Sequence, residues 1–509
     1  MLEDNEIYIL FIYLIIKSIY INFCYTFLKK YIFYKSILYT KMYNINKGGK
    51  VLASGGFGCV FTPALKCEGT RTREKNKVSK LMTEKHAIQE YEEINKYKRI
   101  LETVPNYEDY YLLYDINICR PAKLTTTDLQ NFKKCTALPK KNITKKNINE
   151  SLDKVMTLNM PNGGLPVDDY LYEDGSFQKI YDVHVSLVKL LKKGIIPMND
   201  KNIYHCDIKD ANILVQRETE LKTRLIDWGL STEYVPFRNQ IFPSTWRNRP
   251  LQYNVPFSVI LFSDSFIEKY TKYLEDNVKD KKNDIKLTAT QLKPFAIDYI
   301  NFWMKERGAG HYKYINEVMF MLFANSLTDI SESDKPQVIE TQITMEYIVD
   351  YIVDVLLHFT KFKADGSLDL RQYLDNVFIK IVDIWGFIIS YVPIIEILSD
   401  NYNSLTKQEL KIFNQLQFIF VEYLYNPRHE PIDMKELYTD LKILGDLLHI
   451  KLTGKKPISP TSDTKKSVGK GIHKKTRKNK IKNDKNTRVS FKRGPKKRRF
   501  KHPVFLSLK

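Results

Sequence analysis

Short stretches in which apolar and polar residues alternate occupy the chain after residue 47, as expected for strands of a half-buried sheet. The clearest of them covers residues 77–82. Residues 115–124 and 154–158 are predicted to complete the same sheet. Between these two segments, the Lys- and Asn-rich stretch 131–149 has no such alternation and is predicted to be an exposed insertion.

Longer stretches in which apolar residues recur every three or four positions predict helices. One follows the strand at 77–82 and covers residues 84–100. A second covers residues 176–194, with a Ser cap at its start and a Gly at its end. Later stretches with the same periodicity cover residues 299–323, 345–359, 408–425 and 434–448. The chain is therefore predicted to be α+β, with the sheet first and the helices after it.

An almost continuous apolar run covers residues 7–28. Its 22 residues are enough to span a bilayer, although Lys17 adds roughly 2.5–3.5 kcal/mol to the free energy of insertion. Acidic residues precede the run and lysines follow it, so the positive-inside rule leaves the body of the chain in the cytosol. Residues 1–43 are either a membrane anchor or an extension upstream of a second start at Met42, and both interpretations stay open.

The composition suits a large folded body. The chain has 509 residues, of which 43% are apolar, and this length allows two to four domain-sized units. Its six cysteines are scattered and form no C-x-x-C pair. This distribution argues against a zinc site or a disulfide scaffold and favours a reducing compartment.

The net charge of +21 is concentrated near the C-terminus. Residues 454–503 contain 20 Lys and Arg against two acidic residues, so this tail carries +18 and the body is nearly neutral. The tail lacks hydrophobic periodicity and is predicted to be disordered. A polycation gains affinity for nucleic acid or acidic partners by counterion release, and residues 494–501 look like a nuclear import signal. A merely solubilising tail is the alternative.

Residues 204–231 hold the densest group of chemically useful side chains. They read Y-H-C-D-I-K-D-A-N-I-L-V, then a polar hairpin, then T-R-L-I-D-W-G-L-S. Asp207, Lys209 and Asn212 stand at offsets 0, +2 and +5, and Asp227 begins a D-W-G motif. This stretch resembles the catalytic loop (H-R-D-x-K-x-x-N) and the D-F-G motif of protein kinases.

The resemblance implies a role for each of these four side chains in phosphoryl transfer from ATP. Asp207 would accept the hydrogen bond of the attacking hydroxyl, and Lys209 would neutralise the γ-phosphate. Asn212 and Asp227 would hold Mg²⁺, which takes hard oxygen ligands. The reaction needs positioned groups and metal charge more than covalent help from the protein.

Residues 48–61 read G-G-K-V-L-A-S-G-G-F-G-C-V-F and resemble the kinase Gly-rich loop, G-x-G-x-x-G-x-V. With the motif registered on Val60, Gly55 and Gly58 take the second and third glycine positions, while Ala53 replaces the first. Glycine suits these positions because backbone amides must approach phosphate closely. The expected nucleotide-contacting residues are Ala53, Ser54, Gly55, Gly56, Phe57, Gly58 and Val60.

Lys80 is the expected ATP-phosphate lysine, because K-V-S-K resembles the V-A-x-K strand of kinases. Lys77 is a competitor but would lie on the other face of the strand. Glu90 or Glu93, three apart on one face of the following helix, should form an ion pair with Lys80. Glu90 is favoured, because the apolar residues after it then have the packing offsets usual in kinases.

Residues 157–164, T-L-N-M-P-N-G-G, resemble the hinge between the two kinase lobes. Leu158 would be the gatekeeper beside the adenine pocket. Asn159 and Met160 would offer backbone groups to adenine. The two glycines would lead into the large lobe.

Two departures from the kinase pattern stand out. Cys206 replaces the usual Arg of H-R-D, which normally pairs with a phosphate on the activation segment, so that phosphate would not be needed for activity. No A-P-E motif follows D-W-G. Instead, residues 249–258 (R-P-L-Q-Y-N-V-P-F-S) resemble the kinase-like proteins of giant nucleocytoplasmic DNA viruses, to which the similarity is greatest.

The helix that normally supports the kinase catalytic loop is expected late, at V-D-I-W-G-F. Asp383 would then cap the catalytic-loop backbone, and Trp385 would lie in the core. Residues 264–371 would form a helical insertion. The alternative is that D-I-W belongs to an ordinary buried helix and that the fold departs from the kinase pattern after Phe262.

Together these features predict a two-lobed, protein-kinase-like fold, with residues 47–164 as small lobe and hinge, 165–452 as large lobe and 453–509 as tail. The predicted activity is a Ser/Thr protein kinase using Mg-ATP, since Lys209 at +2 favours Ser/Thr over Tyr substrates. The host cytoplasm or a virion would be its location, with membrane attachment or nuclear import as options. A small-molecule kinase and a pseudokinase scaffold with a nucleic-acid-binding tail are the alternatives.

Overall fold

The computed structural model describes residues 50–238, 242–277, 287–361, 368 and 370–455. The chain divides into two compact units at residue 457, and the second unit lies outside the described residues. The apolar run at 7–28 and the basic tail after residue 455 also lie outside them. The predictions of a membrane anchor and of a nucleic-acid-binding tail therefore stay predictions.

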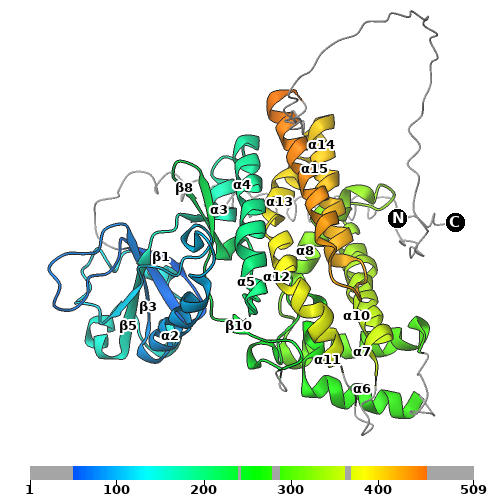
Figure 1. Cartoon of the computed structure of the whole chain (residues 1–509), viewed down its shortest axis with the longest axis horizontal. Helices are drawn as coiled ribbons and strands as arrows, with labels where there is room; N and C mark the ends of the chain where they lie inside the picture. Colours follow the sequence, from blue (N-terminus) through cyan, green and yellow to red (C-terminus); the bar gives the residue numbers. More distant parts are fainter. Residues whose placement is uncertain (1–49, 239–241, 278–286, 362–367, 369, 456–509) are drawn as a thin grey trace, which may run out of the picture. The chain divides into compact units, whose positions relative to one another are not determined.

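The described residues form an α+β structure, with an antiparallel sheet first and a mainly helical part after it (Figure 1). The strand order in the sheet is β1-β2-β3-β5-β4, and its members are β1 (Lys50–Ser54), β2 (Gly58–Thr62), β3 (Lys77–Thr83), β4 (Asn117–Cys119) and β5 (Val155–Pro161). The central strand β3 pairs with β5 from Lys77↔Pro161 to Thr83↔Val155. The strands predicted from alternation are thus confirmed.

Helix α2 (Glu84–Leu101) begins directly after β3 and lies along one face of the sheet (Figure 1). Its buried residues are Ala87, Ile94, Tyr97 and Leu101. They recur every three to seven positions, which places them on one face of the helix. The helix predicted for residues 84–100 is therefore confirmed, and its apolar stripe explains how it attaches to the sheet.

The segment between β4 and β5 exposes its lysines, as predicted for residues 131–149, but its apolar residues are buried. It forms four short 3₁₀ turns, η2 (Phe132–Lys134), η3 (Pro139–Lys141), η4 (Ile148–Glu150) and η5 (Leu152–Lys154). Phe132, Leu138, Ile143 and Ile148 are buried in a second small core with apolar residues of the sheet. Because these apolar residues are spaced irregularly between polar ones, no strand or helix period reveals their burial.

Two disulfides, Cys59–Cys135 and Cys67–Cys119, join strands of the sheet to the segments around it. The prediction of no disulfide scaffold, made from cysteine spacing, is therefore wrong for this part of the chain, while the reducing compartment stays a prediction. The paired cysteines are 76 and 52 residues apart, so only the folded chain brings them together. Among the described cysteines, Cys206 alone is free.

The helical part begins with α3 (Val167–Tyr172) and α4 (Phe177–Leu190). The Ser176 side chain caps α4, as predicted. The helix does not end at Gly194, however, because a π turn and α5 (Ile196–Asp200) continue it. Short strands lie on both sides of these helices. β6 (Leu165–Pro166) precedes them, and β7 (Ile203–Tyr204), β8 (Ile213–Arg217), β9 (Leu221–Leu225) and β10 (Thr232–Glu233) come after them.

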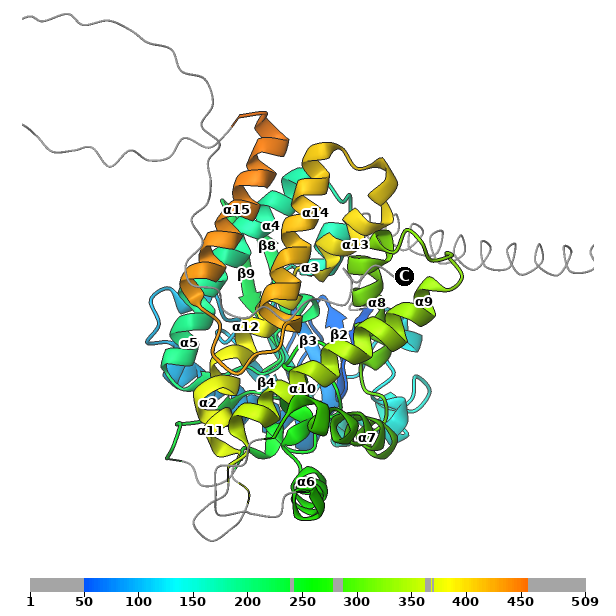
Figure 2. The same cartoon turned by 90° about the vertical axis from the view of Figure 1, so that its right-hand side faces the viewer.

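The predicted insertion is helical. It contains α6 (Asp264–Asn277), α7 (Ala289–Arg307), α8 (Tyr312–Phe323), α9 (Lys335–Val338), α10 (Met345–Phe359) and α11 (Arg371–Tyr373). The periodic stretch 299–323 is two helices, because Gly308 and Gly310 adopt positive φ between α7 and α8. The chain continues with α12 (Ile379–Ile389), α13 (Val392–Asp400), α14 (Lys407–Phe420) and α15 (Met434–Thr453), seen together in Figure 2.

The run from Arg371 to Asp400 is long and apolar enough to cross a membrane. Within the structure, however, 89% of its most apolar window is buried. Trp385 and the apolar residues around it have almost no exposed surface. This run is therefore the central core of the helical part, around which α10, α14 and α4 are arranged (Figure 2).

Candidate active site

Three polar side chains surround Asp207, which lies in the loop between β7 and β8. Lys209 Nζ lies 2.9 Å from Asp207 Oδ2, and Asn212 Nδ2 donates to the same oxygen at 2.8 Å. Asn254, from a segment far along the chain, donates to Asp207 Oδ1 at 2.8 Å. Both carboxylate oxygens are thus held, and the orientation of the group is fixed.

The ionisation of Asp207 follows from these contacts. Burial alone would raise the pKa of the carboxyl, but Lys209, Asn254 and His205 outweigh it and the pKa lies below its usual value. Asp207 is therefore an ionised hydrogen-bond acceptor at neutral pH. A carboxylate of this kind can accept a hydrogen bond from a hydroxyl that approaches phosphate.

Asn212 and Asp227 lie on neighbouring segments, because Ile226 N donates to Asn212 O at 3.0 Å. Both hydrogen bonds of the Asn212 side chain use Nδ2, so Oδ1 is the atom that could bind a metal. Asp227 has a positive φ of 65° and an exposed side chain. An amide oxygen and an exposed carboxylate on neighbouring segments are hard ligands of the type that Mg²⁺ takes.

Lys80 forms an ion pair with Glu90, at 2.7 Å from Nζ to Oε1. The choice of Glu90 is confirmed, since Glu93 instead accepts from Gln89. Burial lowers the pKa of Lys80, but Glu90 and Asp227 raise it above its usual value. Lys77 lies on the other face of β3 and contacts Glu74 and Asp115, so it is no competitor.

One row of cross-strand neighbours on the sheet includes several of the predicted nucleotide-contacting residues. Ala53 is opposite Val60, Val60 is opposite Lys80, and Lys80 is opposite Leu158. Directly opposite residues in an antiparallel sheet present their side chains on the same face. Ala53, Val60 and the buried Leu158 therefore share the face on which Lys80 meets α2.

The turn between β1 and β2 is the predicted phosphate-binding loop, and Gly55 N donates to Gly58 O at 2.9 Å across it. A β-carbon at Gly58 would lie 2.7 Å from Leu81 O, so only glycine fits there. A β-carbon at Gly55 or Gly56 would meet open space or ordinary contacts. Phe57, at the tip, is 62% exposed and lies beside His86.

Ser54 is tied to the segment that follows Cys135, a contact that the sequence does not indicate. Thr136 N and Ala137 N donate to Ser54 Oγ at 3.0 and 3.3 Å. The Cys59–Cys135 disulfide lies in the same place, one residue beyond Gly58. The predicted phosphate-binding loop is thus braced by a segment about eighty residues later in the chain.

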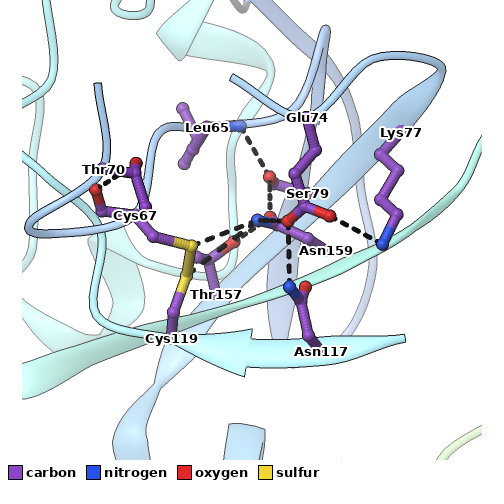
Figure 3. The surroundings of a disulfide bond; sticks show 10 residues. All are labelled: Leu65, Cys67, Thr70, Glu74, Lys77, Ser79, Asn117, Cys119, Thr157 and Asn159. Carbon is purple, nitrogen blue, oxygen red and sulfur yellow. Dashed lines mark hydrogen bonds and ion pairs between the residues drawn. A yellow bond between two sulfur atoms is a disulfide. The ribbon is translucent and has the colours of Figure 1, made fainter. Parts of the chain in front are cut away.

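The predicted hinge residues follow Leu158 on β5. The Asn159 side chain points to the opposite face of the sheet, where it bonds Ser79 and Glu74 beside the Cys67–Cys119 disulfide (Figure 3). Only its backbone can therefore face a nucleotide. Met160 lies beyond the ladder with β4, which ends at Asn117↔Asn159. Its backbone is the better placed of the two for an adenine contact.

Trp228 of the D-W-G motif connects the sheet side with the loop. Its buried ring lies 5.8 Å from the Tyr97 ring of α2 and 5.0 Å from the His205 ring. Tyr97 Oη also donates to Ser231 O at 2.6 Å. The helix that carries Glu90 is thus attached to the segment that carries Asp227.

Helix α12 contacts the backbone of the loop between β7 and β8, as expected for V-D-I-W-G-F. Asp383 accepts from the backbone N–H groups of His205 and Cys206 at 2.9 and 2.8 Å. Asn199 donates to it as well, at 2.7 Å. Gly386 lies against the backbone of Ile208. The predicted cap of the loop backbone by Asp383 is therefore confirmed, while the kinase-like fold after Phe262 stays a prediction.

Three residues that contact Cys206 or Asp207 were not predicted, and all three come from the segment 246–254. Trp246 Nε1 donates to Cys206 Sγ at 2.9 Å, and Arg249 Nη1 donates to Cys206 O at 2.9 Å. The third is Asn254, described above. The sequence analysis singled out the R-P-L-Q-Y-N-V-P-F-S block by a resemblance alone. That resemblance did not indicate which residues these side chains would contact.

A scan against protein-family models gives no match for this chain, and a search of curated proteins gives no relative. The chemistry of the site therefore has to be argued from its geometry. The geometry provides an ionised acceptor, a neighbouring ammonium group, two oxygen ligands for a hard cation and a second ammonium held by a glutamate.

Proposed function

We propose that this protein is a Mg-ATP-dependent Ser/Thr protein kinase with a two-lobed, protein-kinase-like fold. The proposal rests on the close approach of three charged side chains from separate elements, Lys80, Glu90 and Asp227. Lys80 of β3 is paired with Glu90 of α2, and Asp227 of the D-W-G motif is close enough to raise the pKa of the same lysine. A lysine between a helix glutamate and a metal-ligand aspartate is suited to hold ATP phosphates.

Each group then has one task in the transfer. Bound Mg²⁺ would neutralise charge on the phosphates, with Asn212 and Asp227 as its protein ligands. Lys80 holds the nucleotide phosphates, and Glu90 keeps its ammonium group in place. Asp207 accepts the hydrogen bond of the acceptor hydroxyl, while Lys209, 2.9 Å from Asp207, offsets charge on the transferred group.

The direct test is incubation of the full chain with labelled ATP, Mg²⁺ and a panel of acceptor proteins. Asp207→Ala should reduce transfer by about 10²–10⁴-fold, the usual contribution of a positioned acid–base group, and should leave nucleotide binding nearly intact. Asp227→Ala should also remove Mg²⁺-dependent nucleotide binding. The exposed Asp264→Asn is the matched control and should do neither.

The alternatives give different results in the same assay. A pseudokinase would bind nucleotide without phosphorylating any acceptor, and a small-molecule kinase would consume ATP only when a metabolite extract is added. Transfer to proteins that is equal in wild type and Asp207→Ala would contradict the proposal. Phosphoamino-acid analysis of the labelled acceptors checks the Ser/Thr preference separately.

A further inference from the structure

Helix α10 and the loop before α15 bring together Asp354, His358 and His429, none of which belongs to the candidate active site. Their ligand atoms all lie within 4.8 Å of one another. His429 Nδ1 is 2.9 Å from Asp354 Oδ2, and His358 Nδ1 is 3.4 Å from Asp354 Oδ1 and 2.8 Å from the backbone oxygen of Asp354, which leaves Nε2 of His358 as its ligand atom. Each oxygen of one carboxylate therefore faces a nitrogen of a different imidazole.

The spacing explains how the chain builds this cluster. Asp354 and His358 are four residues apart on α10, so their side chains lie on the same face of the helix. His429 comes from the other side, on the loop between Tyr425 and α15. The two imidazole rings are stacked, with centroids 3.6 Å apart and planes 4° from parallel.

We propose that Asp354, His358 and His429 form a binding site for a divalent transition-metal ion, with Zn²⁺ the favoured occupant. Two neutral imidazoles and one carboxylate give a site of charge −1, which a dication turns into a net +1. Zn²⁺ combines nitrogen and carboxylate ligands at about 2.0–2.2 Å, and three protein ligands plus water complete its tetrahedron. Mg²⁺ and Ca²⁺ prefer sites made of oxygen alone.

Burial and exposure are distributed as such a site requires. Asp354 is buried, whereas His358 and His429 are partly exposed, so an ion can enter from solvent on the imidazole side. An imidazole binds a metal in the plane of its ring, and the two stacked rings must therefore turn apart about their Cβ–Cγ bonds. The neighbouring Arg428 is directed elsewhere, with Nη2 donating to Glu422 O at 2.6 Å.

A metal at this place would have a structural effect. It would join α10, which belongs to the helical insertion, to the loop that leads into the last helix of the described body. The insertion would then be fixed to the C-terminal helices by coordination bonds in addition to apolar packing. The proposal does not depend on the kinase assignment, because the candidate active site contributes no ligand.

The test uses the full chain after dialysis against a chelator, in a buffer with excess Mg²⁺ that occupies hard oxygen sites. Zn²⁺ is titrated calorimetrically, and Co²⁺ is added separately because its visible absorption reports tetrahedral nitrogen and oxygen ligands. We expect the wild type to bind one more equivalent of Zn²⁺ than His429→Ala or His358→Ala. Loss of an outer-shell partner already costs about 10–100-fold in metal affinity, so loss of a ligand should cost at least that much.

The matched control is His449→Ala, which removes a partly exposed imidazole from α15 outside the cluster and should leave the extra equivalent intact. Zn²⁺ should raise the melting temperature of wild type and of the control, but not of His429→Ala. Equal Zn²⁺ stoichiometry and affinity in wild type and His429→Ala would overturn the site. The absence of Co²⁺ absorption in the wild type would overturn it without reference to any variant.

Discussion

Gly386 of α12 lies against the backbone of Ile208, where a β-carbon would be 2.5 Å from the Ile208 carbonyl oxygen. The helix can approach the catalytic loop this closely only because residue 386 has no side chain. Ile208 follows Asp207 directly, so any displacement of this carbonyl moves the proposed acceptor of the substrate hydroxyl. The close contact therefore couples the position of α12 directly to the position of Asp207, the proposed acceptor.

Gly386→Ala should consequently damage activity more than stability. Insertion of a methyl group into a packed core costs about 1–3 kcal/mol of unfolding free energy, while a displacement near 1 Å at the reacting groups can cost about 10²-fold in rate. The variant should fold, bind nucleotide and transfer phosphate about a hundredfold more slowly. Steady-state kinetics and urea unfolding of the same preparation separate the two effects.

The matched control for this prediction is Ile384→Val. Two residues along a helix correspond to about 200° of rotation, so this buried side chain points away from the catalytic loop. Loss of one methylene should cost about 0.5–1.5 kcal/mol and leave the rate within a few-fold of wild type. If both variants lost rate in proportion to stability, the contact between Gly386 and Ile208 would have no special role.

Glu90 and Glu93 provide a matched pair of tests for Lys80, the proposed phosphate-binding lysine. Glu90→Gln keeps the shape but removes the charge that faces Lys80 at 2.7 Å, in a place where both side chains are mostly buried. A hydrogen bond between charged groups contributes about 1.5–3 kcal/mol, so kcat/KM for ATP should fall by about ten- to a hundredfold. Glu93→Gln should change it little, because Glu93 pairs with Gln89. Equal losses in the two variants would contradict the assignment of Glu90.

The two disulfides should have similar effects on stability but different effects on nucleotide binding. They close loops of 76 and 52 residues, for which the chain-entropy model gives about 4 kcal/mol each. Replacing both cysteines of either pair by serine should therefore lower the unfolding free energy by a similar amount. Only Cys59–Cys135 lies beside Ser54 and the predicted phosphate-binding loop.

We therefore expect the Cys59→Ser, Cys135→Ser double variant to raise KM for ATP several-fold. The Cys67→Ser, Cys119→Ser double variant serves as the control and should keep KM near the wild-type value. Measurement with and without a dithiol reductant gives a second comparison, since reduction of the wild type should reproduce the first double variant. An unchanged KM in all four conditions would show that the brace does not reach the nucleotide.

Local periodicity was sufficient to predict the parts of the fold whose information lies in neighbouring residues. The β3–α2 unit and the ion pair of Lys80 with Glu90 follow from alternation, helical spacing and a motif that fits within fifteen residues. Asp383 could also be placed, because a short motif marks it. In each of these cases the residues that decide the structure are close together in the sequence.

The features that were not predicted depend on residues that lie far apart in the sequence. The burial of the apolar residues within 131–149, the pairing of Cys59 with Cys135 and the contact of Asn254 with Asp207 all join positions that are distant in the chain. Irregularly spaced apolar residues carry no period, and cysteine pairing depends on the final fold. Such contacts become visible only when the sheet and the helices are placed in space.

Asp210, next to Lys209, should give the folded protein a characteristic pH dependence. Burial, with the nearby Asp168 adding to it, raises the pKa of Asp210 from 3.8 to about 7. The folded state thus holds a proton that the unfolded state has already lost. Stability should therefore be highest below about pH 4 as far as this group is concerned, and should fall as the pH rises to about 7.

A shift of about three pKa units, at about 1.4 kcal/mol each, makes this change on the order of 4 kcal/mol. Asp210→Asn should remove it, so that wild type and variant differ most above pH 7 and least near pH 4. Urea unfolding between pH 4 and 8 measures the difference directly. Asp298→Asn, which removes an exposed carboxylate, is the control, and a pH profile of Asp210→Asn parallel to wild type would contradict the prediction.

The basic tail should bind nucleic acid without any contribution to catalysis. Residues 454–503 carry +18 of the +21, and every proposed catalytic group lies before residue 230. Each neutralised phosphate contributes roughly −0.9 to the slope of log affinity against log salt, so eight contacts would lower duplex affinity by about three to five decades between 50 and 200 mM salt.

Truncation after Thr453, where α15 ends, should abolish this binding and spare phosphoryl transfer. Electrophoretic mobility shifts at the two salt concentrations, with full-length and truncated protein side by side, provide the measurement. Equal DNA affinity of the two proteins would place the contact in the body instead, where the remaining net charge is only about +3.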